Sequence, residues 1–143
     1  MKKNLISFIL PCCFLFLFTQ AVPAKETGTV VKELARTQHS WDGALLPPYP
    51  EGQPEIRILS ITIPPGQKLA VHKHPVINAG VLLSGQLRVQ TTDGQVLNLD
   101  AGEAIVEVVQ TWHWGESIGK DPAHIIVFYA GEEDIPVTIT QQP

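Results

Sequence analysis

The sequence is poor in cysteine: of its 143 residues only Cys12 and Cys13 carry a thiol, and both lie in an apolar stretch near the N-terminus. The rest of the chain therefore offers neither a disulfide nor a thiolate metal ligand. Basic clusters are also absent. Without Lys2 and Lys3, 8 of the 10 basic side chains remain against 14 acidic ones, a net charge of −6 with neutral histidines. This balance argues against nucleic acid and against an anionic membrane surface as partners.

The first 24 residues predict a secretory signal peptide. Lys2 and Lys3 give a positive start, residues 5–18 are almost wholly apolar, and small residues precede a predicted cleavage site after Ala24. A membrane anchor is the less favoured interpretation, because this run is shorter than the roughly 20 residues that span a bilayer. We therefore expect an exported protein, periplasmic or secreted, in which residues 25–143 form a single domain and do not contact the membrane after cleavage.

Residues 25–143 show no sustained helical period and no linker rich in Gly or Ser. Short runs rich in β-branched residues alternate with turn residues instead, which predicts an all-β domain. The predicted strands are residues 56–63, 69–74, 76–83, 86–92, 95–99, 103–109, 112–117, 123–130 and 136–140. Residues 27–54 are rich in proline and are expected to form a first strand and then a long loop.

Two turns are predicted from their residue types. Pro64-Pro65-Gly66 suits a type II turn with Pro65 and Gly66 at its two central positions. Asp93-Gly94 is typical of a two-residue hairpin turn. The first turn would end the strand at 56–63, and the second would join the strands at 86–92 and 95–99.

Three histidines form the pattern that carries most of the chemistry: His72 and His74, separated by one residue, and His113. Alternate residues of a strand share a face, so His72 and His74 point the same way and Asn78 shares their parity if Pro75 inserts no bulge. His113 can join them only from a neighbouring strand. Convergent imidazoles predict a metal site, since burying them without a partner would be costly. Exposed polar alternation is the competing interpretation.

Other residues near these histidines have less specific assignments. Glu116 could act as a catalytic base at the mouth of a pocket, and Glu107 has the same status, although an ordinary solvated carboxylate is the favoured interpretation for both. Trp112 and Trp114 flank His113 and are expected to face away from it. The interior around the imidazoles is expected to contain apolar residues such as Val71, Val81, Leu83, Val106 and Val108.

Two stretches of the sequence resemble the two motifs of the cupins, small β-barrels whose motifs supply metal ligands. Residues 66–85 begin and end with glycine and have His72 and His74 in the histidine places of the first motif. Residues 102–117 resemble the second motif, with His113 in its histidine place. The resemblance covers about half of the expected domain, and implies a single-domain cupin-type β-barrel, a jelly-roll-like antiparallel double sheet, that forms a homodimer.

The sequence also departs from the family pattern. Asn78 stands where the first motif has a glutamate ligand, and Val108, Gln110 and Ser117 stand where the second has proline, glycine and asparagine. The resemblance therefore implies three inner ligands, His72, His74 and His113, with Asn78 as a weak or outer ligand. Loss of the carboxylate would raise the net charge of a divalent site from +1 to +2, and we expect such a site to prefer anionic or chelating molecules.

These residues predict a divalent transition metal as cofactor, with Fe, Mn, Zn, Ni and Cu all open because imidazole suits several of them. The favoured function is oxidation by dioxygen or isomerisation of a small anionic or chelating molecule at the metal. The alternative is a module that binds or senses a small ligand without turnover. The two would be distinguished by a test for turnover.

Overall fold

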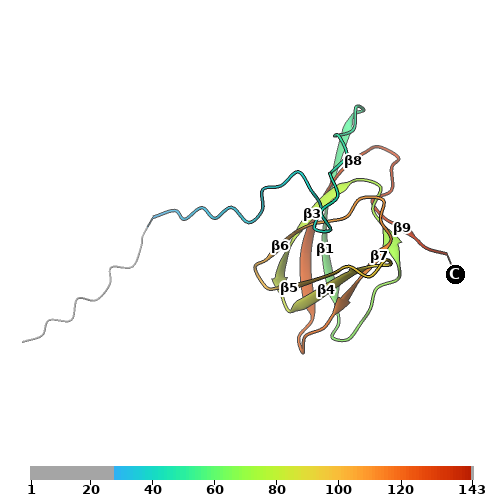
Figure 1. The fold of residues 1–143 in the computed structure, drawn as a ribbon. Helices are drawn as coiled ribbons and strands as arrows, with labels where there is room; N and C mark the ends of the chain where they lie inside the picture. The colour runs from blue at the N-terminus through green and yellow to red at the C-terminus, as the bar shows by residue number, and fades with distance from the viewer. Residues whose placement is uncertain (1–27, 143) are drawn as a thin grey trace, which may run out of the picture. The chain divides into compact units, whose positions relative to one another are not determined.

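The computed structural model describes residues 28–142, and the predicted signal peptide lies outside this range (Figure 1). The compact unit begins at Lys32. Over the described residues the chain forms nine strands and no helix, so none that could cross a membrane. The strands are β1 (Pro54–Ile63), β2 (His72–Lys73), β3 (Ile77–Ser84), β4 (Gln86–Thr91), β5 (Val96–Asp100), β6 (Ala104–Val106), β7 (His113–Ser117), β8 (Ala123–Glu132) and β9 (Ile139–Thr140).

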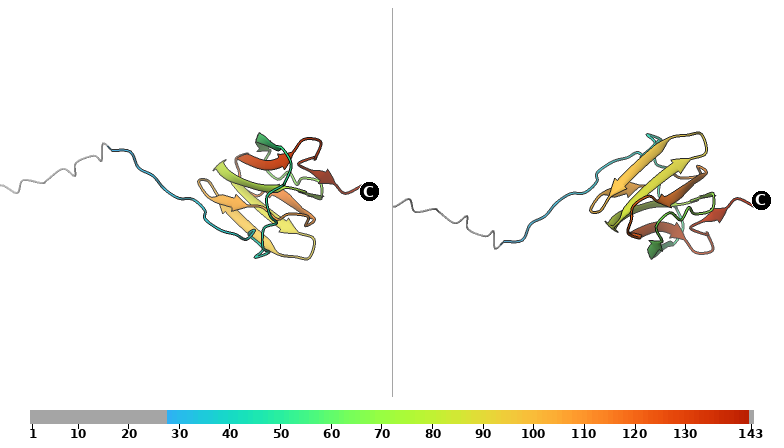
Figure 2. Two further views of the ribbon diagram at one scale, coloured as in Figure 1. Left: turned by 90° about the horizontal axis from the view of Figure 1, so that it is seen from above. Right: turned by 90° about the horizontal axis from the view of Figure 1, so that it is seen from below.

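The strands form two sheets (Figures 1 and 2). One sheet has the order β1-β8-β3-β6 and the other β5-β4-β7-β2-β9, and every pair of neighbouring strands is antiparallel. Strands that are distant in sequence lie side by side, as β1 and β8 do over ten residue pairs. The predicted all-β fold, an antiparallel double sheet of the jelly-roll kind, is confirmed.

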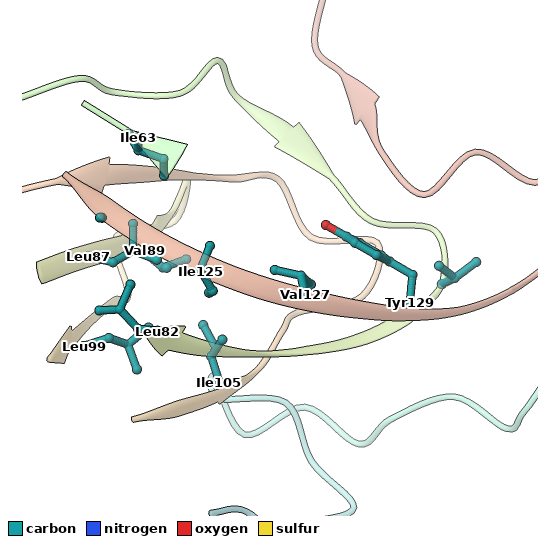
Figure 3. Close-up of a cluster of buried hydrophobic side chains, with 11 residues drawn as sticks. Ile63, Leu82, Leu87, Val89, Leu99, Ile105, Ile125, Val127 and Tyr129 are labelled. Atoms are coloured by element: carbon teal, nitrogen blue, oxygen red, sulfur yellow. The ribbon is translucent and has the colours of Figure 1, made fainter. Parts of the chain in front are cut away.

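The core lies between the two sheets (Figure 3). Alternation along β8 shows how it forms: Ile125, Val127 and Tyr129 point inward and are buried, whereas Phe128 between them is 42% exposed on the outer face. Other strands of both sheets also contribute buried side chains. The core cluster is Ile63, Val76, Leu82, Leu87, Val89, Leu99, Ile105, Ala123, Ile125, Val127 and Tyr129. Packing of these side chains supplies the hydrophobic stabilisation that residues 28–142, which contain no cysteine, need.

The predicted interior was partly wrong. Val108 is fully buried, but Leu83 is 51% exposed, and Val81 and Val106 are only half-buried because they alternate with the buried Leu82 and Ile105. The four-stranded sheet carries apolar residues on both faces. Alternation of polar and apolar residues therefore does not show which face of β3 or β6 points inward.

The type II turn predicted at Pro64-Pro65-Gly66 is supported by its geometry. The amide of Gln67 donates a hydrogen bond to the carbonyl oxygen of Pro64 (3.0 Å), and Gly66 has a φ of +73°. A left-handed residue at this position is what distinguishes a type II turn from a type I turn.

The hairpin at Asp93-Gly94 exists, but the prediction of a two-residue turn was wrong. The Thr91 amide donates to the carbonyl oxygen of Gln95 (3.0 Å), so three residues, 92–94, lie between the last hydrogen-bonded pair of the hairpin. Only Gly94 has a positive φ, +99°. The side-chain oxygen of Thr91 accepts a bond from the Gln95 amide (3.0 Å) and supports the longer loop.

The strand expected at the start of residues 27–54 is absent from the described part, residues 28–53. A tight loop closed by a bridge between His39 and Leu45 occurs instead. The amide of Trp41 donates to the carbonyl oxygen of Val106 (2.9 Å), which anchors this loop beside β6. Prolines 47, 48 and 50 have no amide hydrogen, so the segment that follows is poorly suited to a sheet ladder.

We predict that Gly85→Ala destabilises the fold more than Gly94→Ala. Both glycines have positive φ, +76° and +99°, where a side chain costs about 1–2 kcal/mol. At Gly85 an added Cβ would also clash with the Pro122 carbonyl and lie 2.8 Å from the Cα of Ala123, whereas at Gly94 nothing lies within 4 Å. Urea denaturation of both variants measures the difference, and equal losses of stability would contradict the expected clash.

Candidate metal centre

The three predicted histidines meet inside the double sheet. His72 of β2 is directly opposite His113 of β7, and His74 follows β2 by one residue. Their ring centroids are 4.5–5.0 Å apart, and one ring nitrogen from each lies within 4.8 Å of the others. The antiparallel pairing of β2 with β7 thus brings residues from distant parts of the sequence to one point.

Hydrogen bonds at Nδ1 fix the orientation of all three rings. Nδ1 of His72 lies 2.7 Å from the carbonyl oxygen of Ala70, that of His74 2.8 Å from Val137 O, and that of His113 2.9 Å from Thr111 O. A carbonyl oxygen can only accept, so each Nδ1 carries the hydrogen. In the neutral rings Nε2 keeps its lone pair, so this tautomer leaves Nε2 free to bind a metal.

Burial keeps these rings neutral. Burial lowers the pKa of all three histidines, and that of His74 falls to about 4, although the bond to the Val137 carbonyl partly opposes this effect. The neighbouring rings lower the pKa of His72 and His74 further, because two positive charges at this separation repel. Three neutral imidazoles with free Nε2 atoms fit a borderline divalent metal ion well.

The loop between β6 and β7 also holds the backbone of His74 in place. The amide of Gln110 donates to the carbonyl oxygen of His74 (2.8 Å), and Gln110 has a φ of +60°. Gln110 occupies the place of the motif glycine, and the left-handed backbone that favours glycine is kept at this position.

Glu107 is the acidic residue that the structure brings to the histidines. Its side chain is 10% exposed, and Oε2 lies 3.9 Å from Nε2 of His113 without a hydrogen-bond partner. The expectation of a solvated carboxylate at this position was wrong. Because Glu107 follows the buried Ile105 by two residues, it points to the same inner face.

Burial also controls the ionisation of Glu107. Burial raises the pKa of Glu107 to about 7, and the side chain of Trp41 and the charge interaction with His72 partly oppose this rise. The indole Nε1 of Trp41 is buried and makes no hydrogen bond of good geometry. A carboxyl group with this pKa exchanges protons near neutral pH.

Asn78 lies in the same cavity, but it reaches the cavity from β3 of the other sheet and not from a continuation of β2. It is fully buried on β3, and its Nδ2 donates to the carbonyl oxygen of Val76 (3.2 Å). Its Oδ1 is left without a partner. The structure therefore places Asn78 beside the three histidines, as a neutral oxygen donor.

The structure does not bring Glu116 into this cavity. Glu116 is three residues from His113 on β7, and because side chains alternate along a strand it points to the opposite face. Its partner in the neighbouring strand β4 is Arg88. Trp112 and Trp114 also lie outside the cavity lining, and Lys73 and Lys68 respectively lie over their rings.

The cavity around the histidines has a volume of about 250 Å³. Its polar lining comes mainly from the three histidines, Asn78 and Glu107, with Thr138 and Thr140 at the β9 side. The walls are otherwise mostly apolar, formed by Leu59, Ile61, Leu69, Leu87, Val89, Ile125, Val127 and Tyr129. An apolar cavity with a few convergent polar groups is typical of a small-molecule site.

We predict that Glu107→Gln increases the stability of the metal-free protein relative to wild type, and that this increase is larger at pH 8 than at pH 5. The folded-state pKa of Glu107 is raised from 4.5 to about 7. The folded protein therefore holds this proton more tightly than the unfolded chain does. As the pH rises from 4.5 to about 7, the wild type loses about 3 kcal/mol of stability, at 1.36 kcal/mol per pKa unit. Glutamine does not titrate, so the difference between variant and wild type should widen with pH.

Urea denaturation in the presence of a chelator, at pH 5 and at pH 8, measures this difference. Glu133→Gln is the matched control, because Glu133 is exposed and lies outside the cavity. A stability difference between Glu107→Gln and wild type that is the same at both pH values would contradict the prediction.

Comparisons with known proteins agree with this geometry. Residues 59–129 match the family model Cupin_2, described as a cupin domain. No curated protein matches the chain. Among solved structures, a conserved protein with a double-stranded β-helix domain from Klebsiella pneumoniae is 20% identical, with a TM-score of 0.51, 68% of this chain covered and 91% of that one.

Two groups of enzymes share the fold. The DMSP lyase DddQ from Ruegeria pomeroyi is 16% identical, with a TM-score of 0.54, and covers 62% of this chain. Oxalate decarboxylase from Lactobacillus farciminis is 21% identical, with a TM-score of 0.51, and covers 59%. The chain spans only 44% of the DMSP lyase structures and 26% of the decarboxylase. These likenesses concern the fold, and the family match places a cupin domain over residues 59–129.

Proposed function

We propose that this protein binds a divalent transition metal through Nε2 of His72, His74 and His113 and acts on a small anionic or chelating molecule. The observation that carries the proposal is the convergence of three neutral imidazoles whose Nδ1 atoms are all bonded to backbone carbonyls. The ion itself would supply Lewis acidity or redox chemistry with open coordination positions. Fe, Mn, Zn, Ni and Cu all suit this donor set.

The residues around the ion have separate roles in this proposal. The three Nδ1 bonds hold the rings rigid, which preserves the position of the free Nε2 atoms. The mostly apolar walls and the cavity volume of about 250 Å³ suit a small molecule. Glu107 adds a buried carboxyl group to the cavity, with Oε2 3.9 Å from Nε2 of His113.

Catalysis is favoured over simple binding by the presence of this second functional group. A pocket that only captures a ligand does not need a buried carboxyl group without a hydrogen-bond partner beside three imidazoles. We infer oxidation by dioxygen or isomerisation as the class of reaction, and a binding or sensing module is the alternative. Solved cupin neighbours named for DMSP and oxalate support a small substrate, but not its identity.

Export to the periplasm or outside the cell and assembly as a homodimer complete the proposal. Export is supported by the sequence of residues 1–24. A second copy of the chain is supported by the outer face of the edge strand β1, where Ile56 and Ile58 are 51% and 65% exposed, with Phe128 of β8 beside Ile58.

We predict that His113→Ala loses stoichiometric metal while His39→Ala retains it. His113 provides one of three ligands, whereas His39 is exposed in the N-terminal loop, so the two substitutions remove the same side chain from different environments. The protein would be loaded in turn with Fe, Mn, Zn, Ni and Cu, and the bound metal measured by elemental analysis after removal of the excess. Equal metal content in both variants would overturn the proposed site.

We predict turnover of a small carboxylate or another chelating molecule by the loaded protein. Consumption of dioxygen and loss of substrate would be followed for small carboxylates, thiols, phenols and diketones, with His113→Ala and His39→Ala as inactive and active variants. Saturable binding of a compound without chemical change would instead support the binding module. Turnover that persists in His113→Ala would show that the reaction does not occur at this centre.

A further inference from the structure

Position 78 lacks the carboxylate of the motif, and the carboxyl group of Glu107 lies in the same cavity. We propose that Glu107 is the fourth ligand of the metal ion, so that the site consists of three imidazoles and one carboxylate. This inference rests on the proposed function, since it concerns the same ion. It assigns to residue 107 the role that the sequence motif gives to residue 78.

Backbone pairing places the two positions next to each other. Ala79 of β3 is opposite Val106 of β6, and the Glu107 amide continues this ladder by donating to the carbonyl oxygen of Asn78 (3.0 Å). Both side chains line the cavity, and both residues are buried. A carboxylate from residue 107 therefore enters the space that a carboxylate from residue 78 would have entered, from the adjacent strand end.

The distance to the histidines fits a shared ion. Oε2 of Glu107 lies 3.9 Å from Nε2 of His113. Two ligand atoms that each bind zinc at about 2.0–2.2 Å lie roughly 3–4 Å apart, depending on the angle between them. Glu107 thus needs little movement to share an ion with His113.

Unsatisfied polar atoms support the same arrangement. Oε2 of Glu107 is buried and accepts no hydrogen bond, a costly state for a group that carries charge. A bound cation would remove this cost. Oδ1 of Asn78 is also without a partner, but it is a neutral donor, and a carboxylate is the stronger ligand for a divalent ion.

The donor set changes the expected charge of the centre. Three neutral imidazoles leave a divalent site at +2, whereas a carboxylate ligand reduces this charge to +1. A singly charged anionic substrate would then make the centre neutral, which narrows the substrate class to monoanions. The earlier expectation of a +2 centre followed from considering Asn78 alone.

The experiment compares metal affinities of wild type, Glu107→Gln, Asn78→Ala and the control Glu133→Gln. Affinity for Zn²⁺ is measured by competition with a chromophoric chelator, and the visible absorption spectrum of the Co²⁺-loaded protein reports the ligands. We expect Glu107→Gln to bind Zn²⁺ about 10- to 100-fold more weakly and to alter the Co²⁺ spectrum. Asn78→Ala should lose less than about threefold, and Glu133→Gln should match wild type.

The outcomes separate this inference from the proposed function. Wild-type affinity and an unchanged Co²⁺ spectrum in Glu107→Gln would overturn the fourth ligand and leave the three-histidine site intact. A large loss confined to Asn78→Ala would assign the oxygen ligand to Asn78 and would also overturn it. Wild-type protein that binds neither ion would overturn the proposed function together with the inference. Urea denaturation of each variant confirms that affinity is compared between folded proteins.

Discussion

The antiparallel pairing of β2 with β7 is the interaction on which the site depends. It places His72 opposite His113 and lets His74 reach the same cavity from the residue after β2. Because side chains alternate along a strand, a shift of one residue in this register would turn His113 outward and bring Trp112 or Trp114 inward. The carbonyl bonds at the three Nδ1 atoms then fix ring orientation, so the backbone controls both the position and the protonation of the ligands.

Much of the fold and of the histidine site was predictable because local rules determine them. Alternation predicted that His72 and His74 share a face, and turn chemistry located Gly66 and Gly94 at positive φ. The pairing of His113 with His72 needed more than local rules, since 40 residues separate them. The spacing of glycines and histidines in the two motifs supplied that information through a resemblance to known barrels.

The failures have a common physical cause. Val81 and Val106 were expected inside because both faces of their sheet are apolar, so residue type does not reveal orientation. Glu107 was expected in solvent because a carboxylate is seldom buried without a partner. The signal was nevertheless present, since Val106 and Val108 flank it and a charged residue inside an apolar strand points either to solvent or to a site. Choosing between these requires the inward position of Ile105, which only the structure gives.

The cost of this interior connects stability with function. Three imidazoles, an amide oxygen and a carboxyl group are buried within one cavity, and in the metal-free protein burial shifts the pKa of Glu107 upward and that of His74 downward. Both shifts favour the neutral forms, so the empty cavity resists charge. A bound divalent ion would favour the charged form of Glu107. Only the folded chain binds the ion, since the unfolded chain does not bring β2, β6 and β7 together. Metal binding should therefore stabilise the fold in proportion to the logarithm of the ion concentration above its dissociation constant.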